Sequence, residues 1–108
     1  MAGKGLARGV RLLSAAGTDP IFEVQADGID KVLGIQERIG MGYGLSNPPD
    51  IPGGPRTCYW GGYGGSVIIM DQDYEFTVCY VMNRMESGLV GDMRGTNIVA
   101  AAVTSLLS

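Results

Sequence analysis

Two short hydrophobic runs in the centre of the chain have the pattern of paired β-strands. Residues 67–70 and 76–82 are apolar, rich in β-branched and aromatic side chains, and joined by the polar residues 71–73. This arrangement predicts a β-hairpin. Alternate residues of a strand point to opposite faces, and one face of the second strand is strongly apolar. Its members are Tyr74, Phe76, Val78, Tyr80 and Met82.

The last segment of the chain has the period of an amphipathic helix. Asp92 is in the right place to cap its N-terminus. The apolar stripe of this helix comprises Ile98, Val99, Ala102, Val103 and Leu106. Three consecutive alanines, residues 100–102, would allow a close approach to a sheet. The fold class predicted is therefore α+β: an antiparallel sheet of about three strands with a C-terminal helix packed on one face.

The pattern at the start of the chain is weaker. Residues 1–10 carry little periodic signal and are expected to be poorly ordered. The run Thr18-Asp19-Pro20 predicts the start of a short helix that ends near Gln25, because proline is tolerated in the first helical turn. Residues 27–37 fit neither period, which predicts an irregular, partly extended segment.

Glycine alternates with large apolar residues from Ile39 to Leu45. In a strand this pattern would place every side chain on one face, so a strand is predicted here, with a flexible loop as the alternative. Residues 47–55 contain four of the five prolines and are expected to form a surface loop. Residues 56–62 then lead into the hairpin as a strand that ends in glycines.

Composition and charge narrow the classes of function. The chain has 108 residues, enough for one domain, and 45% of them are hydrophobic. Its net charge is −3 and its basic residues are scattered, which argues against nucleic-acid binding. No apolar run is long enough to cross a bilayer, and the start has no apolar stretch of signal-peptide length. We therefore expect no membrane association and a cytoplasmic location.

Cysteine and histidine content limits the chemistry further. Cys58 and Cys79 are expected to be buried, reduced thiols that pack as small apolar side chains. The chain has no histidine, which removes histidine-based acid–base catalysis and most zinc or iron sites. No metal or other cofactor is expected. The glycines of residues 61–65 make a poor phosphate site, because they precede a strand and no Lys-Ser or Lys-Thr pair follows them.

Three segments resemble the C-terminal end of the β-lactamase-related serine hydrolases. Within that superfamily they are most similar to the family VIII carboxylesterases and the class C β-lactamase-like acyltransferases. The segments are Tyr59–Ser66 (YWGGYGGS), Tyr80–Met85 (YVMNRM) and Gly88–Gly95 (GLVGDMRG), with weaker likeness at residues 9–14 and 40–45. The resemblance implies that residues 1–108 form a single partial domain, the C-terminal portion of a β-lactamase/transpeptidase-like fold.

The resemblance also assigns roles to four residues. This superfamily carries a Lys-Thr-Gly triplet, or a replacement such as Trp-Gly-Gly, on the strand beside the active site. Here the triplet corresponds to Trp60, Gly61 and Gly62. By resemblance, Trp60 faces the acyl pocket, the glycines let substrate lie along the strand, and the Tyr63 amide donates to the oxyanion. The plain alternative is that Trp60 and Tyr63 are packing aromatics.

The sequence departs from the superfamily at the nucleophile. The family needs Ser-x-x-Lys on a helix start and a Tyr-x-Asn or similar element. None of the serines is followed by lysine three residues later, and no Tyr-x-Asn occurs. No catalytic residue is therefore expected in this chain. We interpret it as a fragment of a serine hydrolase or acyltransferase for ester or amide acyl groups, inactive by itself. The alternative is a non-catalytic binding or scaffold module that keeps the apolar pocket wall.

The resemblance bears on partners as well. In the family fold the strand matching residues 76–82 pairs on its far side with an N-terminal strand that this sequence does not contain. An unpaired apolar edge invites pairing with another strand. We therefore expect a partner chain or self-association through the edge of Phe76 to Met82. A small-molecule acyl ester or amide is the expected ligand.

Overall fold

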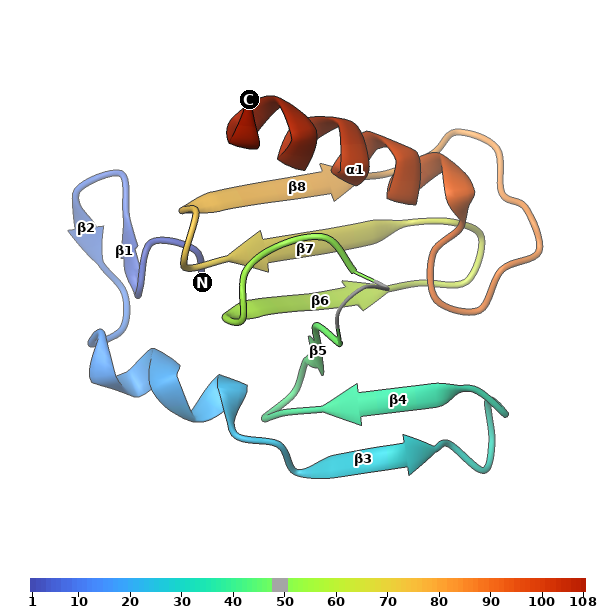
Figure 1. Cartoon of the computed structure of the whole chain (residues 1–108), viewed down its shortest axis with the longest axis horizontal. Helices are drawn as coiled ribbons and strands as arrows, with labels where there is room; N and C mark the ends of the chain where they lie inside the picture. Colours follow the sequence, from blue (N-terminus) through green and yellow to red (C-terminus); the bar gives the residue numbers. More distant parts are fainter. Residues whose placement is uncertain (48–50) are drawn as a thin grey trace.

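A six-stranded antiparallel sheet forms the body of the described chain. The computed structural model describes residues 1–47 and 51–108 (Figure 1). Within these residues the sheet has the strand order β3-β4-β5-β6-β7-β8. Its strands are β3 (Ala26–Ile29), β4 (Gln36–Ile39), β5 (Gly44–Leu45), β6 (Thr57–Gly61), β7 (Val67–Asp71) and β8 (Phe76–Tyr80). The α+β class is confirmed, but the prediction of about three strands is wrong, since the described sheet has twice that number.

Strands β6, β7 and β8 form the regular centre of the sheet. Trp60 pairs with Ile68, which in turn pairs with Cys79. The predicted hairpin is confirmed as β7 and β8, with the turn at residues 72–75 rather than 71–73. The shift arises because Asp71 is the last residue of β7, and its buried side chain accepts the backbone N–H groups of Asp73 and Tyr74 that close the turn.

Helix α1 (Met93–Leu107) lies across β7 and β8 on one face of the sheet (Figure 1). Asp92 caps it as predicted, accepting a hydrogen bond from the Arg94 N–H. The core under the helix is built from Ile69, Val99 and Val103, with Phe76 and Val78 packed against it. This part of the predicted apolar face is confirmed.

Other members of the predicted helix–sheet contact lie outside it. Ile98 is 45% exposed and Leu106 is 53% exposed, so the buried stripe is narrower than the sequence pattern indicates. Tyr74 is also exposed, because it lies in the turn before β8. The close approach lies at buried Gly95, where an added Cβ would stand 2.5 Å from a Val67 methyl group, whereas Ala100 and Ala101 are exposed.

A second core lies on the opposite face of the sheet. It contains Ile21, Leu45, Cys58 and Met70. The covering element is a 3-10 helix, η1 (Ala16–Phe22). The prediction of a helix from Pro20 to Gln25 is therefore wrong in its bounds. The helix starts earlier, at Ala16, and Thr18 donates its hydroxyl to the Ala15 carbonyl within it instead of capping a later helix start.

The segment before β6 differs most from its prediction. Residues 27–37 form most of the β3–β4 hairpin, whose turn is closed by Asp30 accepting the N–H groups of Val32 and Leu33. Those two hydrogen bonds hold the pKa of Asp30 below its usual value. The strand predicted from Ile39 to Leu45 is broken, because β4 ends at Ile39 and a turn precedes the two-residue β5.

Three further predictions concern the start of the chain, the cysteines and the proline-rich loop. Residues 1–10, expected to be poorly ordered, include β1 (Leu6–Ala7), which pairs with β2 (Val10–Arg11). Cys58 is buried, but the prediction of a buried Cys79 is wrong, because its side chain lies on the face of β8 that nothing covers among the described residues. Residues 48–50 of the predicted loop lie outside the described residues.

No helix in the described part of the chain is long and apolar enough to cross a membrane.

Candidate functional site

The Trp60-Gly61-Gly62 triplet lies where β6 extends beyond the end of its neighbour β5. Strand β5 pairs with β6 only at Cys58 and Tyr59. On the other side, β7 stays paired with β6 through Gly61. One edge of the sheet is therefore open next to the triplet among the described residues.

Gly61 is buried, and the ladder determines the side to which its backbone groups point. In an antiparallel ladder, successive residues direct their N–H and C=O groups to opposite sides. Gly62 donates to the Ser66 carbonyl on the β7 side, and the Thr57 carbonyl accepts from Ser46 on the β5 side. The alternation from these two residues places the N–H and C=O of Gly61 on the side facing away from β7. An extended ligand could pair with this edge as a short extra strand.

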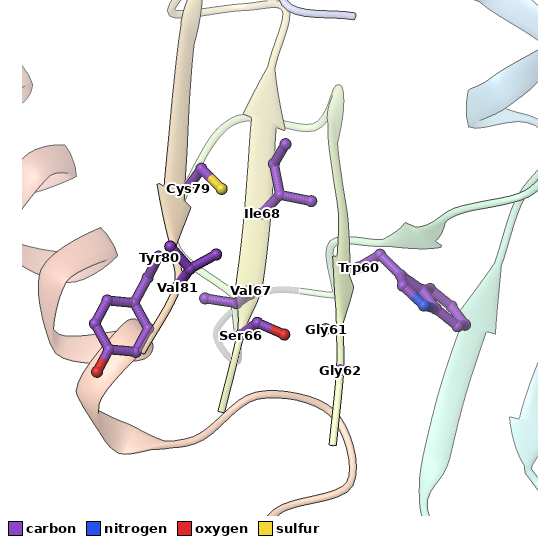
Figure 2. Close-up of a pocket in the computed structure, with 9 residues that line it drawn as sticks. All are labelled: Trp60, Gly61, Gly62, Ser66, Val67, Ile68, Cys79, Tyr80 and Val81. Carbon is purple, nitrogen blue, oxygen red and sulfur yellow. The ribbon is translucent and has the colours of Figure 1, made fainter. Parts of the chain in front are cut away.

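A cavity of about 310 Å³ opens beside the triplet (Figure 2). Trp60, Ile68 and Cys79 project from the face that α1 does not cover, and Ile68 also packs against the edge of the core beneath η1. The Trp60 indole is 49% exposed and points away from β7, whereas Tyr80 points toward the helix (Figure 2). The cavity is lined by Trp60, Gly61, Gly62, Ser66, Val67, Ile68, Cys79, Tyr80 and Val81.

Glycine is required at position 61 by a close crossing of the chain. A Cβ on Gly61 would stand 2.7 Å from backbone atoms of Val90 and Gly91, which pass over the helix-side face of the strand. Backbone atoms cannot give way as a flexible side chain can, so substitution here would displace the whole segment. The same segment is tied to the turn after β6, because the Gly91 N–H donates to the Gly62 carbonyl.

Tyr63 lies next to the cavity but does not line it. It follows Gly62 in a turn closed by the hydrogen bond from the Gly65 N–H to the Gly62 carbonyl. Its side chain is 61% exposed. Among the described residues, its backbone N–H has no acceptor in this turn, so it is available to donate a hydrogen bond to a ligand.

The structure thus brings together three of the four residues predicted to bind substrate, with Tyr63 adjacent in the turn. Sequence reasoning did not identify Ile68, Cys79 or Val81 as wall residues. The register carries a signal for two of them, because Ile68 is directly opposite Trp60 and Cys79 directly opposite Ile68, so these side chains share one face. Val81 lies beyond the end of β8.

The lining can bind an apolar group and pair with a carbonyl or amide, but it offers no strong base. Its polar side chains are those of Trp60, Ser66, Cys79 and Tyr80. No group of three potential metal-binding side chains occurs in the part of the chain that the structure describes. Attack on an acyl group would therefore need a nucleophile and base from elsewhere.

Comparison with known proteins identifies the family to which this part of the fold is similar. The β-lactamase family model matches residues 3–103. The crystal structure of a family VIII carboxylesterase is similar to 95% of the chain with a TM-score of 0.87 and 28% identity. That of a penicillin-binding protein homologue from Caulobacter crescentus is similar to 94% with a TM-score of 0.87 and 27% identity. No curated protein sequence matches significantly. The chain spans 28% of the length of either solved relative. It belongs to the β-lactamase family.

Proposed function

We propose that this chain supplies the acyl-binding wall of a β-lactamase-related serine hydrolase or acyltransferase that acts on ester or amide acyl groups. The observation that carries the proposal is the open edge of β6 at Gly61, next to an apolar cavity with a half-exposed Trp60. A family member with this wall has a place for both parts of an acyl compound, the apolar chain and the polar carbonyl.

Each predicted substrate-binding residue has a role in this proposal. The Trp60 indole contacts the apolar part of the acyl group. Gly61 pairs its backbone with the extended part of the substrate, and Gly62 leaves room for it. The free Tyr63 amide serves as a donor to the developing oxyanion, an interaction whose loss costs about 10² to 10³ in rate where it has been measured.

The proposal assigns no catalytic residue to this chain. Neither Lys4 nor Lys31 stands three residues after a serine. Ser66 lines the cavity but is followed three residues later by Ile69. We therefore propose that the chain alone does not turn over acyl substrates, and that a Ser-x-x-Lys element must come from outside this sequence. Because both cysteines are free, a reducing, cytoplasmic location is part of the proposal.

The experiment is a hydrolysis assay of the purified chain with short-chain p-nitrophenyl esters. We expect no release of nitrophenolate above the rate in buffer. Hydrolysis that a serine-directed reagent abolishes would contradict the assignment of no nucleophile. A Ser66→Ala variant serves as the matched control, since Ser66 is the serine that lines the cavity.

The second candidate function is a non-catalytic binding or scaffold module. The same missing nucleophile favours it, because an apolar wall can bind a ligand without reacting. The two proposals differ when a family member's Ser-x-x-Lys part is added as a separate polypeptide. Restored hydrolysis supports the hydrolase, and binding without any hydrolysis supports the scaffold.

A partner strand is a further part of the proposal. Strand β8 pairs with β7 and with no other strand among the described residues. Thr77, Cys79 and Val81 are exposed beside that edge. These features support pairing of β8 with another chain or with a second copy of this one.

A further inference from the structure

The turn after β6 rests on a charged pair at the start of α1. Arg94 and Asp92 form a salt bridge, with the Arg94 Nη2 2.5 Å from the Asp92 Oδ2 and the Arg94 Nε 3.1 Å from both carboxylate oxygens. The Arg94 guanidinium also donates to two backbone carbonyls, that of Gly64 at 3.0 Å and that of Arg84 at 2.8 Å. One side chain thus connects the helix, the turn and the loop after β8.

The position of this cation is unfavourable for the helix itself. Arg94 lies in the first turn of α1, where the helix dipole is positive and acidic residues are normally favoured. No acidic residue lies in that turn, and the charge of Arg94 is balanced by the capping carboxylate before it. The hydrogen bonds of Asp92 to Arg94 hold the carboxyl pKa below its usual value, although partial burial opposes this. Helix stability therefore does not account for an arginine here.

The turn fits closely against the pair. Gly65 has a φ of +120°, and a Cβ added there would collide with the Asp92 carboxylate and the Arg94 guanidinium. Three backbone hydrogen bonds tie the same turn to the loop after β8: Gly64 N–H to the Gly88 carbonyl, Glu86 N–H to the Gly64 carbonyl and Gly91 N–H to the Gly62 carbonyl. Arg94 donates hydrogen bonds to both sides of this contact, to the Gly64 carbonyl in the turn and to the Arg84 carbonyl in the loop after β8.

We infer that Arg94 is a positioning residue for the acyl wall. By holding the Gly64 and Arg84 carbonyls while paired with Asp92, it fixes the turn of residues 62–65, and with it the backbone of Gly61 and Tyr63 that a substrate would meet. Arg94 itself is not among the residues that line the cavity. The inference rests on the proposed function, because it concerns the affinity of that same site for an acyl ligand.

The test uses two NMR measurements on the 108-residue chain. Amide hydrogen exchange is measured at Gly65 and Gly91, whose N–H groups bond to the Gly62 carbonyl. Affinity for methyl butyrate is measured from the shifts of the Gly61 amide and the Trp60 indole. The variants are Arg94→Gln and Arg94→Lys. The matched control is Arg84→Gln, which removes an exposed arginine side chain but keeps the carbonyl that Arg94 binds.

We expect Arg94→Gln to speed exchange at Gly65 and Gly91 by about tenfold, because the open turn becomes more populated. We expect its affinity for methyl butyrate to fall by about tenfold as well, since small displacements of binding groups are costly. Arg94→Lys should not rescue either property, because an ammonium group cannot bond a carboxylate and two carbonyls in the same fork geometry. Exchange in β3 and β4 should stay unchanged in all variants.

The outcomes separate this inference from the proposed function. Unchanged exchange in Arg94→Gln overturns the inference, and so does faster exchange with unchanged affinity. Full rescue by lysine also overturns it, because charge alone would then be sufficient. If the unsubstituted chain does not bind methyl butyrate, the proposed function fails, while the exchange measurement still decides whether Arg94 holds the turn.

Discussion

Asp71 shows how a single buried residue organises the chain around the central hairpin. Its side chain accepts four hydrogen bonds, from the Thr57 hydroxyl and from the N–H groups of Gly54, Asp73 and Tyr74. Burial would raise the pKa of this carboxyl, but the four hydrogen bonds outweigh burial and lower it. The charged form therefore connects the loop before β6 to the turn before β8.

The substitution Asp71→Asn should lower the free energy of unfolding by about 3 kcal/mol at neutral pH. The NH₂ group of asparagine is a hydrogen-bond donor, and it would face buried donors that now bond to the carboxylate. Since the folded pKa is lowered, the unfolded state binds more protons in acid. Asp71 therefore contributes stability above its unfolded pKa of about 3.9, and this stability is lost as pH falls through the lower folded pKa. Urea unfolding between pH 2 and 7 checks both points. An acid dependence that is the same in variant and parent would contradict this account.

The two cysteines should differ sharply in reactivity. Burial raises the pKa of the Cys58 thiol to about 11. Cys79 is exposed on β8. Because the thiolate is the reactive form, an aromatic disulfide reagent at pH 8 should modify Cys79 quickly and Cys58 only after unfolding. Rapid modification of both thiols in the folded chain would show that Cys58 is not enclosed. Cys79→Ser is the control that leaves only the slow thiol.

At the scale of elements, the sequence predicts those whose pattern is local and strong. The strand pair β7–β8 and helix α1 are predictable because their apolar residues recur at a clear period over five or more positions. Strand β3 escapes prediction because all four of its residues are exposed, so burial imposes no alternation on them. Strand β5 has only two residues, and its place is set by β6 rather than by its own sequence.

The candidate site is predictable only in part, for a related reason. Trp60 and its glycines are recognised from their resemblance to a family motif. The open edge beside Gly61 depends on where β5 ends, and no local pattern marks that point. The contact at Gly95 escapes prediction because glycine in a helix usually signals weakness rather than close packing.

The packing of α1 can be tested at Gly95. An alanine there would gain about 1 kcal/mol in helix propensity. Its Cβ would, however, stand 2.5 Å from a Val67 methyl group and 3.3 Å from the Tyr80 ring. We expect Gly95→Ala to destabilise the fold by about 1–3 kcal/mol, because overpacking outweighs propensity. Thermal unfolding measures this. Asn97→Ala, at an exposed helix position, is the control and should be neutral or slightly stabilising.

The free edge of β8 gives another prediction for an element. The alternation of the β7–β8 ladder places the N–H of Thr77 on the side facing away from β7. Thr77→Pro should therefore block strand pairing at this edge while keeping the hydrogen bonds to β7. We expect the parent chain to self-associate at high concentration and Thr77→Pro to remain monomeric, as measured by light scattering after gel filtration. Thr77→Ala is the control, and equal association of the proline variant would exclude this edge.

At the scale of the whole molecule, the two faces of the sheet are covered unequally. Helix α1 covers one face over β7 and β8 (Figure 1), and η1 packs against the opposite face through Ile21, which contacts Leu45, Cys58 and Met70. Next to the core beneath η1, the same face carries Trp60, Ile68 and Cys79 and borders the open edge of β6. Among the predicted substrate residues, Trp60 and Tyr63 are exposed, whereas Gly61 is buried. The chain spans 28% of the length of either solved relative.

The central claim is that the cavity beside Trp60 binds an acyl group without reacting with it. The most direct measurement is an NMR titration of the chain with a short-chain ester. The account predicts saturable shifts at the Trp60 indole and the Gly61, Gly62 and Tyr63 amides, unchanged shifts in β3, and an intact ester at the end of the titration. Shifts confined to other parts of the chain, or no shifts at all, would contradict it.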